Sequence, residues 1–377
     1  MIYLDNNATT RPLPAVVAAV TDALSLNWAN PSSTHPAGQA ARQLLADARG
    51  VVGRLFGAQP AEVLFTSSAT EANALALHAA LAVPGAPRRL VVSAIEHAGL
   101  LQLAAAREGV ELVRLPVDAR GVVVADALPA VLAGGAALVS VMAANNETGV
   151  IQPVAELARL AAAAGVPMHV DATQLAGRLP VDFTALGVRF MSASAHKLHG
   201  PKGVGVLLVQ KGAPFAPALP GHQERRRRGG TENLPGIAGF AAAARHALAA
   251  PASEPAQIAA LRDALERGLA AVLPLRVFGA GAARLPNTSC VAFGRLDADV
   301  VLQRLARAGI CASSGSACSA GGTEASHVLR AMGVDDEAAR AAVRFSLSAD
   351  TTPAEVAKVI DTLQAALAPL LAEALAA

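Results

Sequence analysis

The sequence has little of what several classes of protein depend on. Its 377 residues include only three cysteines, which is too few and an odd number for a disulfide framework. Charged residues make up 16% of the chain and the net charge is +2, which gives no electrostatic footprint for nucleic acid. The obvious basic run, Arg225–Arg228, is short and lacks interleaved aromatics, so we expect it in a solvated loop, or against a partner surface or a phosphate.

Long apolar runs and a leader segment are missing as well. The mean hydropathy is +0.41, but no uninterrupted apolar run reaches the roughly 18 residues that a membrane-spanning helix needs. The initial string MIYLDNNATT has neither the basic region nor the apolar stretch of a secretory signal peptide. Hydrophobic residues are abundant, at 53%, which excludes a disordered chain. The expectation is a folded cytoplasmic protein of one to three domains, with neither nucleic acid nor membrane as a direct partner.

Short apolar runs alternate with helical patterns over the first half of the chain and beyond. Seven runs have the length and composition of buried strands: Val63–Thr66, Arg89–Ser93, Glu111–Leu115, Ala137–Met142, Met168–Val170, Phe190–Ser192 and Val204–Val209. Most of the stretches between them have helical spacing, as in Leu100–Glu108 and Val154–Ala164. This alternation predicts an α/β fold with a mainly parallel sheet and helices on both faces. Such a sheet places its ligand outside the carboxyl ends of the strands.

The pattern changes near residue 255, where Pro251 and Pro255 interrupt an alanine-rich helix. Beyond it, helical and strand patterns follow one another as in a smaller α+β unit. We therefore predict a large domain over residues 14–255. The small domain would combine residues 1–13 with residues 256–377.

Two reactive side chains follow predicted strands of the large sheet. Asp171 closes the run that ends at Val170, where a carboxylate faces the ligand cleft or caps the next helix. Lys197 lies in the string SASAHKLHGPKGVG after the following strand, as a functional amine or a solvated turn lysine. Pyridoxal 5'-phosphate requires a lysine for a Schiff base, a carboxylate for its protonated ring nitrogen, and a phosphate cup. These two residues can meet the first two requirements.

The string FTSSATEAN has the pattern of the phosphate cup. It leads from a strand into a helix, and the backbone N–H groups and hydroxyls of a helix start form an anion site. An ordinary capping box of Ser67 or Ser68 with Glu71 explains the same residues. The two interpretations are compatible, because a helix start can be capped and still bind phosphate.

Three more polar residues stand in positions that suggest a ligand. His97 and Asn146 follow two further strands, where His97 could stack on a flat ring; alternatively, they are an ordinary loop histidine and part of a plain turn. Arg344 lies inside the apolar strand Val343–Ser348, where a lone guanidinium needs a partner. A substrate carboxylate and a protein carboxylate are equally good candidates for that partner.

The stretch Cys311–Gly322 consists almost entirely of small, flexible residues. A long structureless segment inside a compact domain is uncommon unless it is functional or disordered. Cys318 lies in its middle, in the accessible setting that suits a reactive thiolate. Cys290 and Cys311 follow or lie in apolar runs and are expected to be buried.

In their order along the chain, these motifs resemble one known family. The matching strings are YLDNNATT, NPSS, FTSSATEAN, EH at residues 96–97, NNETG, HVDATQ, HKLHGPKGVG, GHQER with GGTEN, SSGSAC, SHVLRAMG and VRFSLS. By these strings the chain is identified as a member of the cysteine desulfurases, fold type I pyridoxal-phosphate enzymes of the class V aminotransferase group, and it most closely resembles their nitrogen-fixation type. The resemblance implies a homodimer that converts L-cysteine to L-alanine. It also implies that an enzyme-bound persulfide supplies a sulfur-acceptor protein, for iron–sulfur cluster assembly or thiolation.

The resemblance implies a role for each candidate residue. Lys197 would form the Schiff base and move the Cα proton, His97 would stack on the ring and assist, and Cys318 would be the nucleophile. Asn146 and Arg344 would hold the substrate carboxylate. The other cofactor contacts would be Asp171 and Gln174 at the ring, and Ala69, Thr70, Ser194, His196 and, from the other subunit, Thr231 at the phosphate. No metal is part of this interpretation.

Two alternatives remain at this stage. A selenocysteine lyase or an aminotransferase on the same scaffold would keep Lys197 and Asp171 but would not need Cys318 for a cysteine substrate. A cofactor-binding or sulfur-scaffold protein without activity would be the non-enzymatic alternative.

Overall fold

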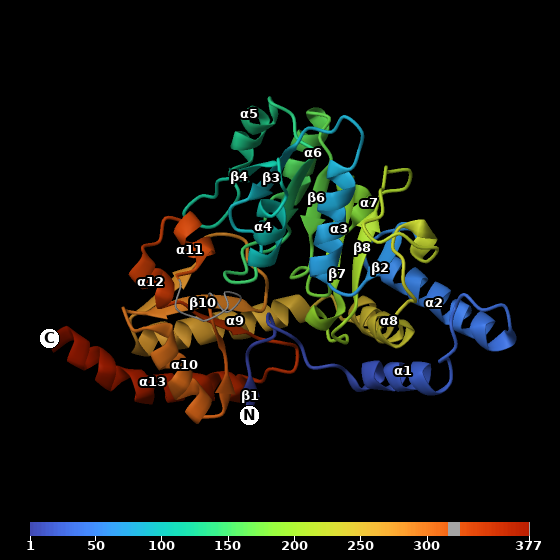
Figure 1. Ribbon diagram of the computed structural model, residues 1–377. Coiled ribbons are helices and arrows are strands. Elements are labelled where there is room, and N and C mark those ends of the chain that lie inside the picture. Colours follow the sequence, from blue (N-terminus) through green and yellow to red (C-terminus); the bar gives the residue numbers. More distant parts are fainter. Residues whose placement is uncertain (316–324, 377) are drawn as a thin grey trace.

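The computed structural model describes residues 1–315 and 325–376, and Figure 1 shows a large sheet flanked by helices with a smaller sheet beside it. The strands of the large sheet are β2 (Val63–Thr66), β3 (Arg89–Ser93), β4 (Glu111–Leu115), β5 (Leu138–Met142), β6 (Met168–Asp171), β7 (Phe190–Ser194) and β8 (Gly205–Val209). Their order is β2-β8-β7-β6-β5-β3-β4. Only β8 runs antiparallel to its neighbours, so the prediction of a mainly parallel α/β sheet is confirmed.

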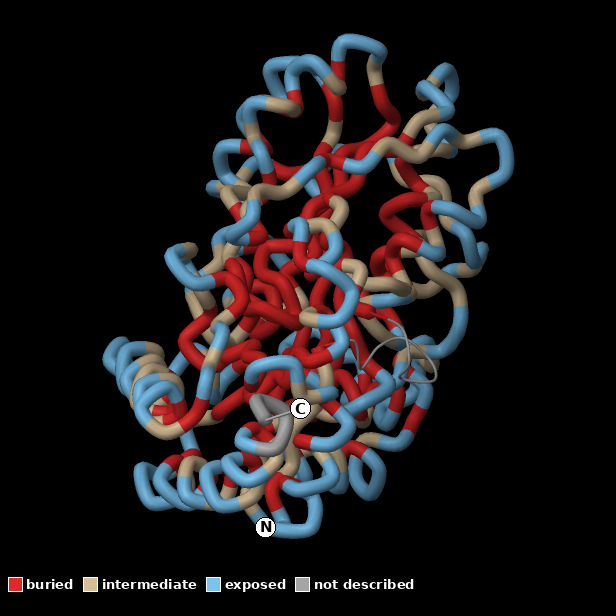
Figure 2. Tube along the Cα trace, turned by 90° about the vertical axis from the view of Figure 1, so that its left-hand side faces the viewer, coloured by how far each residue is buried: buried red, intermediate tan, exposed pale blue. Residues whose placement is uncertain are grey.

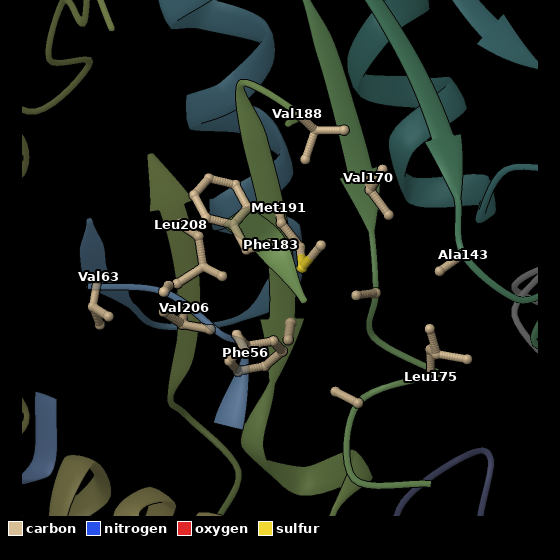
Figure 3. Close-up of a cluster of buried hydrophobic side chains, with 14 of the residues drawn as sticks. Phe56, Val63, Ala143, Val170, Leu175, Phe183, Val188, Met191, Val206 and Leu208 are labelled. Carbon is tan, nitrogen blue, oxygen red and sulfur yellow. The ribbon is translucent and has the colours of Figure 1, made fainter. Parts of the chain in front are cut away.

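Helices cover both faces of this sheet, as the sequence pattern predicts. They are α1 (Pro14–Ser25), α2 (Pro36–Leu55), α3 (Ala69–Leu81), α4 (Ala98–Ala105), α5 (Leu128–Leu132), α6 (Val154–Ala163), α7 (Phe183–Leu186) and α8 (Leu234–Ala249), with 3-10 turns η1 (Ala125–Ala127), η2 (Ala195–Lys197) and η3 (Glu224–Arg226). Along β8, Val206 and Leu208 join the hydrophobic cluster of Figure 3, whereas Leu207 joins the cluster under α3 and α4. Because successive strand side chains point to opposite faces, one strand thereby serves two cores.

The smaller sheet is antiparallel, and the N-terminal segment packs onto it. Its strands, in the order β12-β13-β10-β9, are β12 (Ser313–Ser314), β13 (Val343–Ser346), β10 (Thr288–Phe293) and β9 (Leu275–Phe278), while β1 (Ile2–Tyr3) pairs in parallel with β11 (Ile310–Cys311). Its helices are α9 (Glu254–Val272), α10 (Ala298–Arg307), α11 (His327–Ala331), α12 (Asp336–Arg340) and α13 (Pro353–Ala376). Leu4 is buried in the same cluster as Leu269 and Phe345. This packing favours placing the start of the chain with its end, although the exact domain limits stay a prediction.

A third contact region joins the two sheets. Ile95 and Met142, at the ends of large-sheet strands, pack with Phe278 and Leu329 of the small-sheet side in one buried cluster. Figure 2 shows that buried residues fill the centre of the molecule and exposed ones lie along its outer loops and helices. In the described part of the chain, none of the helices is both long and apolar enough to cross a membrane.

Two cysteine predictions have different outcomes. Cys290 on β10 is fully buried, as expected. The prediction that Cys311 is buried is wrong, because it is partly exposed on β11. The strand β11 pairs with the two-residue strand β1, so little of the sheet covers it.

Candidate active site

A cavity of about 300 Å³ lies where β5, β6 and β7 end, beside β13 of the small sheet. This is the edge at which a parallel sheet is expected to hold its ligand. The predicted site residues that line it are Ala69, Thr70, His97, Asn146, Asp171, Gln174, Ser194, His196, Lys197 and Arg344. Thr231 is not among the described residues that line it, and Cys318 lies outside the described part of the chain.

The carboxylate of Asp171 is fixed by two hydrogen bonds at the end of β6. Oδ2 accepts from Nδ2 of Asn73 on α3 at 2.8 Å, and Oδ1 accepts from the backbone N–H of Thr173 at 2.9 Å. Asp171 is only 6% exposed, so its remaining lone pairs face the cavity or the protein rather than bulk water. The bond to Thr173 lies within a turn, and no helix of the described chain begins there, so the alternative of a helix cap is wrong, whereas Asp171 does line the cavity.

The amine of Lys197 lies against the N-terminal segment. Its Nζ donates to the carbonyl oxygen of Asn7 at 2.5 Å and to that of Ala8 at 2.8 Å. The residue is partly buried in η2, directly after β7, and lines the cavity. The alternative of a solvated turn lysine is therefore wrong.

The imidazole of His97 is oriented by the helix that it caps. Its Nδ1 accepts a hydrogen bond from the backbone N–H of Gly99 at 3.1 Å, so the proton of the neutral ring is on Nε2. Burial lowers the pKa of His97; the charge of Asp171 opposes this shift and the charge of Lys197 adds to it. His97 is consequently neutral near pH 7, with Nε2–H as its donor.

The start of α3 has the predicted capping box. Ser68 Oγ accepts from the backbone N–H of Glu71 at 3.2 Å, and Glu71 accepts from the backbone N–H of Ser67 at 2.6 Å. Ala69 and Thr70, the next two residues, line the cavity. Because the first backbone N–H groups of a helix have no partner inside it, the capped helix still offers donors to an anion there.

Ser194 and His196 complete this side of the cavity, which we call the α3 side. Ser194 ends β7, and Nδ1 of His196 lies 3.2 Å from Oγ1 of Thr9. Burial lowers the pKa of His196 to about 4, and the charges of Lys197 and Lys202 contribute to the shift. Its ring is therefore neutral at pH 7 and can donate one hydrogen bond.

Of the two partners expected for Arg344, the structure contains the protein carboxylate. The side chain is 2% exposed; Nη2 forms an ion pair with Asp5 at 2.8 Å, and Nη1 donates to the carbonyl oxygen of Asn146 at 3.0 Å. Its Nε is buried and has no hydrogen-bond partner among the described residues. A guanidinium with an unsatisfied N–H in a cavity wall can donate a hydrogen bond to a further carboxylate.

Besides Asn73, sequence reasoning missed two residues that hold the site together. Asn7 accepts from both Lys197 and Gln174 through its carbonyl oxygen, and its side chain donates to Thr288 on β10 at 2.9 Å. Arg178 donates to Oε1 of Gln174 at 3.0 Å, which assigns Nε2 of that amide as the donor. Asn7 lies in the string YLDNNATT, which signalled the family but not a site residue.

Thr231 lies in a different part of the fold. It is exposed and lines a second cavity, of about 110 Å³, together with Ser67 and Arg228. Arg228 forms an ion pair with Glu71 at 2.8 Å, in the first turn of α3. Of the alternatives for the basic run, Arg228 therefore has the contact with the predicted phosphate region.

The comparisons with known proteins agree with one another. The family model described as aminotransferase class-V matches residues 2–359. The cysteine desulfurase of Cereibacter sphaeroides is 46% identical over 96% of this chain and 94% of that protein. The cysteine desulfurase NifS of Azotobacter vinelandii is 43% identical over 95% of this chain and 90% of that protein. A solved structure described as a NifS-like protein has a TM-score of 0.91 at 34% identity, covering 97% of this chain and 99% of that chain.

The family match spans both sheets and every described residue of the cavity wall. Enzymes of this family generally depend on pyridoxal phosphate. The chain therefore belongs to the aminotransferase class-V family, among its cysteine desulfurases of the NifS type.

Proposed function

We propose that this chain binds pyridoxal 5'-phosphate and converts L-cysteine to L-alanine, retaining the sulfur as a persulfide on Cys318. One observation supports the proposal above all others. A single cavity brings an amine, a carboxylate, a neutral imidazole and a helix start together at the strand ends where the fold places ligands. Neither a turn lysine nor a simple helix cap would require that convergence.

The donors and acceptors of the cavity fit this cofactor. Thr70, Ser194 and His196 on the α3 side suit a phosphate, Lys197 suits the aldehyde carbon, and Asp171 suits the protonated ring nitrogen. Gln174, whose Nε2 is the donor, would bond the phenolic oxygen, and Ala69 would contribute a backbone N–H. When bound, the cofactor supplies an electron sink for the carbanion at the substrate Cα.

The residues around the substrate have separate tasks. Arg344 and Asn146 would bind the substrate carboxylate, since Nε of Arg344 is buried without a partner. The amine of Lys197 would take the Cα proton, and His97 would donate from Nε2.

Sulfur transfer then requires the nucleophile. The thiolate of Cys318 attacks the substrate sulfur, so that an S–S bond forms and the substrate C–S bond breaks. The electron pair of the broken bond stays on carbon, which gains a proton and becomes the methyl group of alanine. Cysteine and the enzyme thiol thus give alanine and an enzyme persulfide, without any further oxidant.

The partners follow from the same proposal. A sulfur-acceptor protein, either a scaffold or a sulfur carrier, would take the persulfide sulfur in the cytoplasm. Thr231 is exposed and lies outside the cavity of its own chain, which favours a homodimer in which it reaches the phosphate of the partner subunit.

Two variants test the proposal. In Lys197→Ala, borohydride treatment should no longer fix the cofactor to the protein, as judged by mass spectrometry, whereas Lys211→Ala, at an exposed lysine, should behave like the wild type. Cys318→Ala should keep the bound cofactor but stop the release of sulfide and alanine from cysteine. Full sulfide release by Cys318→Ala would refute the desulfurase mechanism and favour another enzyme on this scaffold.

A further inference from the structure

We propose that a chain of four buried polar side chains behind the cavity holds and aims the carboxylate of Asp171, with His169 as its positioning residue. In order toward Asp171, the members are Ser140, His169, Ser192 and Asn73. We call this set the relay. The inference rests on the proposed function, because it concerns the carboxylate assigned to the cofactor's ring nitrogen.

The relay crosses three neighbouring strands and ends on a helix. Ser140 on β5 lies opposite His169 on β6 in the sheet register, and Ser192 on β7 lies opposite Asp171. The side chains of Ser140, His169 and Ser192 are fully buried, and Asn73, on α3, is 4% exposed. Only Asn73 of the four lines the cavity, so no step of the proposed reaction uses the others directly.

The contacts are continuous from one end to the other. Ser140 Oγ lies 2.8 Å from Nδ1 of His169, and Nε2 of the same ring lies 3.1 Å from Oγ of Ser192. Ser192 Oγ lies 2.5 Å from Oδ1 of Asn73, whose Nδ2 donates to Asp171 at 2.8 Å. Each side chain of the relay is therefore hydrogen-bonded to the next, from Ser140 to Asp171.

The direction of every bond follows from the carboxylate. Because an ionised carboxylate only accepts, Asn73 must present its NH₂ to Asp171 and turn Oδ1 toward Ser192. That oxygen also only accepts, so the hydroxyl of Ser192 must donate to it. Ser192 Oγ is then left to accept a hydrogen bond from the ring of His169.

The tautomer of His169 is fixed by the same logic. Nε2 must carry the proton that is donated to Ser192, and a neutral ring leaves Nδ1 to accept from the hydroxyl of Ser140. Burial lowers the pKa of His169 to about 4, although the charge of Asp171 acts in the opposite direction. All four bonds thus point toward Asp171, and bonds aligned in this way strengthen one another.

Reversing the ring would undo the arrangement at Asp171. With the proton on Nδ1, His169 could accept from Ser192, whose hydroxyl would no longer donate to Asn73. The amide of Asn73 could then turn its oxygen toward the carboxylate, and the hydrogen bond that aims Asp171 would be replaced by a repulsion between two oxygens. A misaligned Asp171 would hold the proton of a ring nitrogen less well. His169 therefore acts on Asp171 through two intervening side chains.

A first experiment reads the tautomer without any cofactor. Histidine labelled with ¹⁵N on the ring should show, in the full-length wild-type protein, an Nε2–H signal for His169 that is unchanged between pH 5.5 and 8. The signal is assigned by its loss in His169→Phe. An Nδ1–H ring, or a charged ring at pH 7, would overturn the proposal.

A second experiment reads the effect on Asp171 in the holoenzyme. In holoenzyme reconstituted with pyridoxal phosphate that carries ¹⁵N at the ring nitrogen, Ser192→Ala should lower the pKa of that nitrogen, read from its ¹⁵N chemical shift, by about one unit, a tenfold change in proton affinity, because Asp171 supports the ring-nitrogen proton less well. Ser192→Thr, which keeps the hydroxyl, should restore the wild-type value. Ser289→Ala is the matched control, since Ser289 is equally buried and its hydroxyl has no partner among the described residues.

The outcomes separate this inference from the proposed function. A shift in Ser192→Ala that is absent in Ser289→Ala and reversed in Ser192→Thr supports the relay. Equal titrations in Ser192→Ala and the wild type overturn it, even if Ser192→Ala is less thermally stable, since a merely structural role changes stability alone. A wild type that binds no pyridoxal phosphate would refute the proposed function, and the histidine spectra would still decide the direction of the relay.

Discussion

Under the proposed function, two regions of the cavity wall each hold an anion, and they do so in different ways. On the α3 side, the donors are neutral: the first turn of the helix, the hydroxyl of Ser194 and the imidazole of His196, whose pKa burial lowers to about 4. On the opposite strand, β13, the donor is the full charge of Arg344, which the carboxylate of Asp5 already partly neutralises. We call this second region the β13 side.

The difference corresponds to how long each ligand stays. Neutral donors fixed by a helix and a strand need no rearrangement and suit a phosphate that remains bound through many turnovers. A buried arginine that shares its charge between a protein carboxylate and a passing one can release its ligand after each turnover. Under the proposed function, the chain would thus separate retention of the cofactor from exchange of the substrate, and the predictions for Arg344, Thr70 and Asp5 below test that separation.

The largest effect is expected at the β13 side. Arg344→Lys keeps the charge but loses the planar fork, so kcat/KM for cysteine should fall about a hundredfold, or about 2.7 kcal/mol, mainly through KM. Cofactor affinity, measured by fluorescence titration, should change less than twofold. Arg284→Lys is the control, because Arg284 is a mostly covered arginine that is paired with Glu266 at 2.7 Å and does not line the cavity. Loss of cofactor affinity equal to the loss of kcat/KM would contradict the separation.

At the α3 side we expect the opposite result, weaker cofactor binding with an unchanged KM. Thr70→Val removes a hydroxyl with little change in volume, so cofactor affinity should fall about tenfold, in line with a hydrogen bond to a charged group. At saturating cofactor, KM for cysteine should stay within twofold of the wild type. Thr21→Val, at an exposed position on α1, controls for the substitution itself. A higher KM with unchanged cofactor affinity would show that Thr70 serves the substrate instead.

The strand-end rule explains how much of this site the sequence predicts. Asp171 and Lys197 follow apolar runs directly, so their place at one sheet edge follows from local pattern and topology. The capping box at Ser68 is equally local. These features need no knowledge of which distant segment packs against which.

Apart from the bond of Arg178 to Gln174, four positions away, the contributions that sequence reasoning missed are non-local. Asn73 bonds Asp171 across 98 positions, and Asn7 bonds Thr288 across 281, so neither partner is visible from spacing. The buried position of Arg344 demanded a partner, but the sequence could not show that Asp5 supplies it. The wrong prediction for Cys311 has the same origin, because the burial of a strand depends on what pairs beside it.

Burial also keeps the carboxyl group of Glu96, in the loop after β3, protonated, and the pH dependence of stability tests this. Glu96 is fully buried beside His97, and burial raises its pKa to about 8. Between pH 4.5 and 8, the folded state therefore holds a proton that the unfolded state releases, so the free energy of unfolding falls as pH rises. In Glu96→Gln, urea denaturation at pH 5.5, 6.5 and 7.5 should show a shallower fall than the wild type, by up to about 1.4 kcal/mol per pH unit, because the contribution of Glu96 is removed while that of the buried Glu147 remains. Glu156→Gln, at an exposed position, should keep the wild-type slope, and an unchanged slope in Glu96→Gln would show that Glu96 is ionised in the fold.

The smallest effect is expected at Arg344, where the carboxylate of Asp5 and that of a ligand would compete for one guanidinium. Asp5→Asn keeps an acceptor for Nη2 of Arg344 but removes the charge that partly neutralises it, so a ligand carboxylate should bind about threefold more tightly, or about 0.6 kcal/mol. Because cysteine and alanine carry the same carboxylate, KM for cysteine and the inhibition constant of alanine should fall by the same factor, while cofactor affinity stays constant. Asp118→Asn, which removes a carboxylate paired with Arg120 at the surface, should change neither constant. A fall confined to cysteine would mean that Asp5 acts on the substrate's thiol or amine, and a rise in both constants would mean that it orients Arg344 more than it competes for it.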